Sequence, residues 1–333
     1  MKDLSTKQNF VGCDVSKDTL DFALYEKGKK YSSFQHIKVD NNLEGFKAMS
    51  KWLRSLKVKI KDTVIAMEHT GFYSVALAEW AHSKKITFVF LHPMDVKNAC
   101  SRGRNKTDKA DAQFIADYVY TMREKLAPST PEDSITKRLR QLFNERRATV
   151  KTRTRYLNLL KTLSDRESVK RVKKLIEILS KQIDEIEKQM KQVIKTDPDL
   201  SKNFKLLLSI QGIGLVNAVA TIIATGNFTR FQTSRQYAKF ICVSPMAKQS
   251  GTSINKGNHV SKAGHNELKA ILTEGANSAV AHDASLKAYY NRKIAEGKTR
   301  ECVLNAVKFK LVCRMFAVIK RQTPYVNTEK YRG

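Results

Sequence analysis

The chain has 333 residues, with 61 lysines and arginines against 32 aspartates and glutamates, which gives a formal charge of +29 at pH 7. So many positive charges repel one another unless a polyanion neutralises them, so we expect a nucleic-acid partner. Hydrophobic residues make up 41% of the chain, which argues against disorder of the whole. The length predicts two or three domains, since single cores rarely grow past about 250 residues.

The sequence carries no pattern typical of membranes or of an oxidising compartment. Its first residues, MKDLSTKQNF, lack the apolar core of a signal peptide, and no apolar run approaches the ~20 residues of a membrane span. No basic amphipathic segment has a bulky aromatic face, which argues against an anionic membrane as the partner. The cysteines are odd in number and form no CxxC pair, which predicts reduced thiols in a cytoplasmic protein and no zinc site. They are Cys13, Cys100, Cys242, Cys302 and Cys313.

The first region alternates short apolar runs with helical periodicity, in the order β-β-β-α-β-α-β-α. A polar basic loop precedes the last helix, and Pro128 and Pro131 follow it as a plausible domain boundary. The predicted strands are 9–15, 20–26, 33–39, 63–67 and 86–91, and the predicted helices are 42–56, 72–84 and 107–124.

Four carboxylates fall at the edges of these elements. Asp14 ends the first strand, Glu68 follows the fourth strand, and Asp108 and Asp111 share one face of the last helix at i and i+3. Converging carboxylates repel unless cations lie between them, and two Mg²⁺ ions about 4 Å apart would satisfy that charge. Each acid alone could be a solvated side chain or a helix cap. The four together, in a basic chain, predict a metal site.

The second region, about 132–196, contains no glycine and predicts a long helical arm. Between 137 and 181 it has 15 Lys and Arg against 4 Asp and Glu. Apolar residues step by threes and fours, a pattern typical of a helix that packs on a partner helix. We expect the arm to dimerise through this apolar seam and to lay its basic face on phosphates. The alternative is a helical hairpin whose charges only keep it soluble. The seam comprises positions 175, 179, 183, 186, 190 and 193.

The third region, about 200–325, is predicted to be mostly helical. Gly212 and Gly214 split two apolar helical segments. That pattern suits a helix-hairpin-helix turn whose backbone amides approach a phosphate, although glycine-split helices also occur for packing alone. Tyr289 and Tyr290 are interpreted as packing residues of a C-terminal helix, with a tyrosine nucleophile left open.

Residues 244–264 are rich in Ser, Gly and Lys and predict an irregular, open loop. Ser250 is a candidate nucleophile there, but a serine hydroxyl needs a base or a metal to activate it. On the residues alone a flexible turn is the simpler interpretation. The lysines that would hold a phosphate beside it are Lys248, Lys256 and Lys262.

The chain carries five motifs in the order VGCDVSKDTLDFAL, AMEHTGFY, KTDKADA, LLLSIQGIG and SPMAKQSGTS. Together these motifs resemble the DEDD transposases of bacterial insertion sequences in the IS110 family. The resemblance spans about 9–325 and implies an α/β N-terminal domain with the RNase H-like, RuvC-like fold at 1–128. It implies a basic helical coiled-coil arm at 129–198, and a C-terminal transposase domain with a helix-hairpin-helix and a serine loop at 199–333.

The resemblance also implies roles for single residues. Asp14, Glu68, Asp108 and Asp111 would form the acidic tetrad that binds Mg²⁺, and Ser250 would hold one DNA end as a phosphoserine ester. A structured bridge RNA from the same element would pair with donor and target DNA. The tetrad of one subunit would meet the serine of another in a homo-oligomer, a dimer or a tetramer. The protein would be bacterial, cytoplasmic and nucleoid-associated, with no membrane partner.

Two other functions remain open on the sequence, and the sequence argues against a third. A metal-dependent endonuclease or Holliday-junction resolvase would activate water with the tetrad and form no covalent protein–DNA species. A non-catalytic nucleic-acid binder would keep every activity when Asp14 is replaced. A sugar kinase or ATPase of the actin-like fold needs a second Asp-Gly phosphate motif in the C-terminal half, which the sequence lacks.

Overall fold

The computed structural model describes residues 4–68, 73–91, 95–96, 99, 107–250, 254–260 and 265–327. The chain divides into two compact units, Met1–Pro131 and Glu132–Gly333. No helix within the described ranges is both long enough and apolar enough to cross a bilayer.

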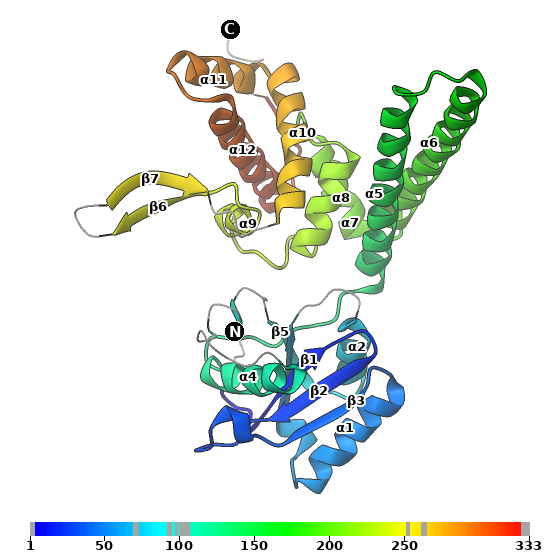
Figure 1. Ribbon diagram of the computed structural model, residues 1–333. Helices are drawn as coiled ribbons and strands as arrows, with labels where there is room; N and C mark the ends of the chain where they lie inside the picture. Colours follow the sequence, from blue (N-terminus) through cyan, green and yellow to red (C-terminus); the bar gives the residue numbers. More distant parts are fainter. Residues whose placement is uncertain are drawn as a thin grey trace. The chain divides into compact units, whose positions relative to one another are not determined.

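The N-terminal unit is built on a mixed five-stranded sheet of order β3-β2-β1-β4-β5 (Figure 1). The first three strands are antiparallel, whereas β1, β4 and β5 run parallel. The predicted element order is confirmed, and the sheet agrees with the expected RNase H-like fold. The strands are β1 (Asn9–Val15), β2 (Thr19–Leu24), β3 (His36–Asp40), β4 (Thr63–Glu68) and β5 (Thr87–Leu91), and the helices are α1 (Leu43–Ser55), α2 (Val75–Ser83) and α4 (Asp108–Thr121).

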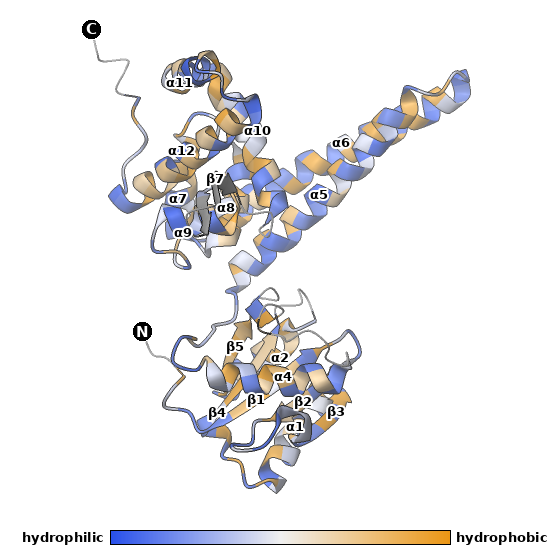
Figure 2. Cartoon of the chain, turned by 60° about the vertical axis from the view of Figure 1, so that its left-hand side comes forward, coloured by the Kyte–Doolittle hydropathy of each residue, from blue (hydrophilic) through white to orange (hydrophobic). Residues whose placement is uncertain are grey.

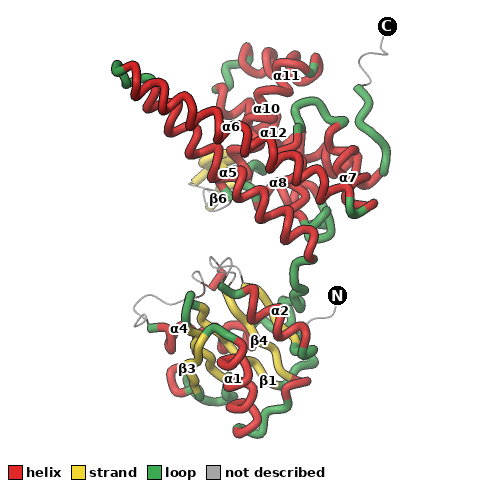
Figure 3. Tube along the Cα trace, turned by 90° about the vertical axis from the view of Figure 1, so that its right-hand side faces the viewer, coloured by secondary structure: helices red, strands yellow, loops and turns green. Residues whose placement is uncertain are grey.

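Alternation along β1 divides its side chains between two cores. Val11 and Cys13 pack with apolar residues of α1 and α2, which cover one face of the sheet (Figure 3). Phe10, one position out of phase, packs with Ile115 of α4 on the other face. Because Asp14 has the same parity as Phe10, its carboxylate lies on the α4 face.

Gly12 lets α4 lie directly against β1. A Cβ at this position would lie 2.2 Å from the carbonyl oxygen of Ala112 and 2.3 Å from the backbone nitrogen of Ala116. Both partners are helix backbone, which cannot move aside as a side-chain end does. The glycine therefore sets the distance of the whole helix from the sheet.

The C-terminal unit begins with the arm, a hairpin of α5 (Ser134–Leu160) and α6 (Arg166–Lys195). The base of α6 buries Ile186 and Met190 in a core that also contains Leu139 and Phe143 of α5. The lower part of the predicted seam is therefore covered within the chain, and its expected use between subunits is wrong for that part. Apolar and polar residues are interspersed along the two helices (Figure 2). Exposed apolar side chains remain on the part of the arm near the α5–α6 turn: Leu157, Leu159, Leu175 and Ile178.

Helices form most of the remainder, as predicted. The segment expected to be an irregular loop instead forms a β-hairpin, with an irregularity in pairing between Ala247 and Gln249. Its strands carry no apolar alternation that would have identified them. The elements are α7 (Pro198–Leu208), α8 (Leu215–Thr225), α9 (Ser234–Phe240), β6 (Pro245–Ser250), β7 (Ile254–Val260), α10 (Asn266–His282), α11 (Ala284–Ala295) and α12 (Arg300–Arg321).

We expect Gly12→Ala to destabilise the N-terminal unit by about 1–3 kcal/mol or more, because the added methyl overpacks the contact with α4. Urea unfolding followed by circular dichroism measures the loss. Gly214→Ala is the matched control, since a Cβ there meets no atom within 4 Å. Equal stability losses in the two variants would contradict the close approach of α4.

Candidate acidic active site

Four charged side chains form a row across the α4 face of the sheet. Asp14 of β1 pairs with Asp21 of β2, and Asp21 pairs in turn with Lys38 of β3. On the other side, the parallel register of β1 and β4 ends at Cys13 opposite Met67, so Glu68 is next to Asp14 at the strand ends. The sheet thus gathers three carboxylates and one ammonium at one level.

The first turn of α4 adds Asp108 and Asp111 to this row. The helix starts there because the Thr107 side chain accepts a hydrogen bond from the backbone N–H of Ala110. Asp111, three residues after Asp108, lies on the same side of the turn and is half-buried. The helix N-terminus carries partial positive charge, which favours carboxylates at this position.

The electrostatics of Asp14 show that these acids are neighbours. Burial, followed by the charges of Asp108, Glu68 and Asp21, raises the pKa of Asp14 from 3.8 to about 6. Each nearby negative charge disfavours ionisation of the half-buried carboxyl. Three of the four predicted tetrad residues therefore interact, and the position of Asp111 in the same helical turn places it beside them.

Asp21 and Lys38 were not identified from the sequence. Asp21 is only 4% exposed, and its carboxylate lies 2.7 Å from Nε2 of His36 and 3.3 Å from Nζ of Lys38. The same ammonium lies 3.3 Å from an oxygen of Asp108. An acid between two buried apolar residues, Leu20 and Phe22, is the signal that could have identified Asp21. Lys38 thus links the sheet row to the helix.

The donor set suits a hard divalent cation, which takes carboxylate oxygens as ligands. Among the described residues, no three His, Cys, Asp or Glu side chains are close enough together to hold a metal ion as they stand. The raised pKa of Asp14 nevertheless shows unneutralised negative charge at this level of the sheet. The cluster fits a cation by its chemistry and requires its carboxylates to converge further.

The predicted serine lies in the other unit. Ser250 is the last residue of β6 and pairs with Ile254 of β7. Lys248 and Lys256 belong to these two strands, whereas Lys262 lies outside the described residues. Figure 1 shows the hairpin extending from the helices of its own unit.

The two glycines of the predicted helix-hairpin-helix differ in role. Gly212 has φ +90°, and a Cβ on it would lie 2.4 Å from the carbonyl oxygen of Gly275 in α10. Packing against α10 therefore explains this glycine. Gly214 is exposed at the start of α8, with open space where a Cβ would be. Packing therefore does not explain Gly214.

Comparison with known proteins yields two family matches. Residues 11–166 match a model of the DEDD transposase domain, and residues 204–291 match a model described as the transposase IS116/IS110/IS902 family. The pilin gene-inverting protein of Moraxella bovis is 27% identical over 330 residues, which cover 96% of this chain and 98% of that protein. The transposase for insertion sequence element IS1111A of Coxiella burnetii is 29% identical over 152 residues, or 43% and 39% of the two chains. An uncharacterized 43.6 kDa protein of insertion element IS110 from Streptomyces coelicolor is 30% identical over 120 residues, or 36% and 29%.

We expect Asp14→Asn to stabilise the metal-free protein at pH 8 and to do so less at pH 5. Because the folded-state pKa of Asp14, about 6, exceeds its ordinary 3.8, its stabilising contribution is complete below about 3.8 and is lost as pH rises through about 6. Asparagine is uncharged throughout and avoids that loss. Urea midpoints measured in EDTA between pH 5 and 8 test this.

Asp18→Asn, at an exposed position of the β1–β2 turn, provides the control and should follow the wild-type pH curve. If Asp14→Asn also followed that curve, the acids would not be close enough to repel one another.

Proposed function

The chain belongs to the IS110 family of transposases, enzymes that cut and join DNA, and we propose that it is an RNA-guided recombinase with Ser250 as nucleophile. The acidic row is the observation that supports DNA cleavage in this proposal, and the family matches support strand joining. A cluster that raises the pKa of Asp14 to about 6 lowers stability at neutral pH and is typical of a functional site. In the proposal, residues 1–128 form the RuvC-like domain, 129–198 the arm and 199–333 the serine-bearing domain.

The DEDD domain implies use of a divalent metal ion. We assign its ligands to Asp14, Glu68, Asp108 and Asp111, with two Mg²⁺ ions per site. Bound ions supply positive charge to the phosphate oxygens during strand cleavage. The chain contributes the positions of the carboxylates: strand ends fix two of them, and the first turn of α4 fixes the others.

In the proposed reaction, Oγ of Ser250 forms a bond to the scissile phosphorus as the P–O bond to the leaving strand breaks. The hydroxyl proton passes to a base, and the leaving oxygen takes up a proton. The resulting phosphoserine ester keeps the bond energy, so a strand can be rejoined without an external energy source. The place of Ser250 at the end of a hairpin strand supports access of DNA, with Lys248, Lys256 and Lys262 as proposed phosphate contacts.

A transposase binds DNA, and the net charge of +29 supports extensive contact with phosphates. We propose donor and target DNA as substrates and a structured RNA that pairs with both. The open N-terminus of α8 at Gly214 adds backbone N–H donors for a phosphate. Contacts of this kind hold the backbone and read no bases, which fits base selection by RNA pairing.

We also propose that the protein assembles as a dimer or tetramer through the arm. Leu157, Leu159, Leu175 and Ile178 are each 40–45% exposed although they are large and apolar. Leu175 and Ile178 are three residues apart and share one face of α6, and an exposed apolar face of this kind is typical of an interaction site. Assembly would allow the acids of one subunit to act with the serine of another.

The second candidate is a metal-dependent endonuclease or junction resolvase. The acidic row alone favours it, because carboxylates and a cation suffice to activate water. In that function Ser250 is structural and no covalent protein–DNA species forms.

We expect a covalent protein–DNA adduct when the purified protein is mixed with Mg²⁺, the noncoding RNA of its own element and labelled donor DNA. Denaturing gels detect the adduct, because a phosphoserine ester survives detergent. Ser250→Ala removes the nucleophile and should abolish the adduct. Asp14→Ala, or EDTA with the wild-type protein, should reduce it by about 10²-fold or more, since charge stabilisation at the phosphate is lost.

Ser253→Ala tests whether any hydroxyl of this segment can serve, and it should retain the adduct. Cut DNA without an adduct, unaffected by Ser250→Ala but lost with Asp14→Ala, would replace the serine mechanism with metal-dependent hydrolysis.

We expect Ile178→Lys to lower the oligomeric state, because it places a charge next to Leu175 on the exposed apolar face of α6. Sedimentation velocity of the free protein measures the change. Gln141→Lys adds the same charge at an exposed polar position of α5, nearer the base of the arm, and should leave the mass unchanged. An unchanged mass in both variants would remove the arm as the interface.

A further inference from the structure

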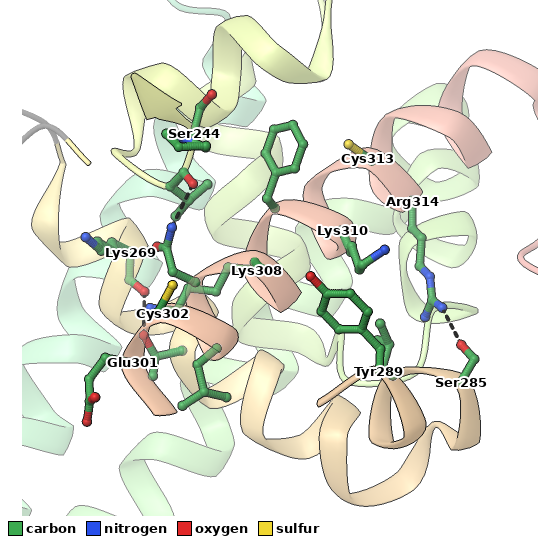
Figure 4. A pocket seen from close by; sticks show the side chains of 18 of the residues that line it. Ser244, Lys269, Ser285, Tyr289, Glu301, Cys302, Lys308, Lys310, Cys313 and Arg314 are labelled. Carbon is green, nitrogen blue, oxygen red and sulfur yellow. Dashed lines mark hydrogen bonds between the residues drawn. The ribbon is translucent and has the colours of Figure 1, made fainter. Parts of the chain in front are cut away.

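A groove of about 1640 Å³ lies within the C-terminal unit. Its walls come from α10, α11 and α12 and from residues 243–245, which lead into β6 (Figure 4). Neither the acidic row nor Ser250 contributes to it. Six of its lining residues are basic and one is acidic.

Three polar side chains of this groove, two of them buried and one half-buried, have no partner for at least one polar atom among the described residues. Lys308 is only 7% exposed, on the buried side of α12 between Leu304 and Leu311, and no carboxylate pairs with it. Ser244 is 2% exposed, and its hydroxyl has no hydrogen-bond partner. Oδ1 of Asn305 is also unpartnered, although the amide nitrogen of this residue donates to the carbonyl of Val243. Each such group costs stability unless a ligand satisfies it.

The charges around Lys308 are uncompensated in the same way. Lys269 lines the groove near Lys308, and burial together with the charge of Lys269 lowers the pKa of Lys308. Within the described ranges neither lysine forms an ion pair. Arg314, by contrast, is held by the buried Asp283 at 2.7 Å, so it serves the fold. An anion in the groove would relieve the repulsion between the two lysines.

An aromatic ring also lines the groove. Tyr289 of α11 is partly exposed in the groove, with Nζ of Lys310 4.4 Å from its ring centroid. Figure 4 shows the two side chains beside each other. A ring next to cations is the combination that binds a base and its phosphate in single-strand sites.

We propose that this groove binds an unpaired stretch of a nucleic-acid strand, with a backbone phosphate at Lys308 and Ser244 and a base against Tyr289. The phosphate accepts hydrogen bonds from the ammonium and the hydroxyl. Oδ1 of Asn305 accepts from a sugar hydroxyl or a base amino group, which a simple inorganic anion does not offer. The strand is unpaired because the faces of bases in a duplex are already stacked.

The groove extends the proposed function because its lining includes residues 243–245, which lead into the strand that ends at Ser250. The link between the groove and Ser250 rests on the proposed function, whereas strand binding itself requires neither the serine nor a metal. The phosphodiester chemistry is shared by DNA and RNA, so both are tested.

Fluorescence anisotropy with labelled strands of about 12 nucleotides, a length typical of single-strand sites, measures binding to the full-length protein in EDTA. We expect Lys308→Met to weaken binding about tenfold, the effect of losing one charge-assisted hydrogen bond. Lys320→Met, an exposed lysine of the same helix, removes the same charge outside the groove and should change affinity less than about twofold. DNA and RNA strands of one sequence, run in parallel, show which source is preferred.

Thermal unfolding separates binding from folding. Since Lys308 is buried without a partner, Lys308→Met should raise the melting temperature while it weakens binding. A strand that contains 5-iodouracil should cross-link to the peptide with Tyr289, and Tyr289→Leu should abolish that product. Wild-type affinity of Lys308→Met, equal losses in Lys308→Met and Lys320→Met, or binding of duplex alone would each overturn the proposal.

Discussion

The contact between Gly12 and the backbone of α4 determines the geometry of the acidic site. A helix this close to β1 places its first turn over the ends of β1 and β4, where Asp14 and Glu68 lie. The first turn of α4 then brings Asp108 close to these strand ends. Any side chain at residue 12 would separate two sets of carboxylates that belong to different elements. Gly12 therefore allows the two sets of carboxylates to lie close together, although it takes no part in the chemistry.

Apolar packing on both faces of the sheet supports an arrangement that electrostatics opposes. Burial and the like charges of the neighbouring acids disfavour the ionised form of Asp14 and raise its pKa to about 6. Lys38 offsets part of the repulsion by linking Asp21 and Asp108, and it does so from a side chain that is half exposed. Such a pair contributes little stability in water. The residual charge is what a divalent cation would neutralise, so the DEDD domain gives up stability for a site that a cation completes.

The sequence predicted features that depend on local pattern and missed those that depend on partners. Alternation and periodicity identified the strands and helices of the N-terminal unit, and strand ends identified Asp14 and Glu68. Asp21 was missed because its role depends on the β1–β2 register, which places it opposite Asp14. Gly212 was assigned to phosphate binding because its contact with Gly275 is invisible without the tertiary structure. The hairpin that contains Ser250 lacks apolar alternation, so its strands could not be identified from the sequence.

The acids of the N-terminal sheet and the lysines of the C-terminal groove are both clusters of like charge, negative in the sheet and positive in the groove. In the sheet, carboxylates lie close together, and a cation would neutralise their charge. In the groove, Lys308 and Lys269 lie close together, and an anion would neutralise their charge. A phosphodiester needs both environments in turn, since lysines bind its charge in the ground state while a cation between acids stabilises the charge that develops on cleavage. Lysines placed among the acids would form ion pairs, as Lys38 does, and their charge would no longer be available to the substrate. Separate units for the two clusters keep each of them uncompensated until nucleic acid and metal are bound.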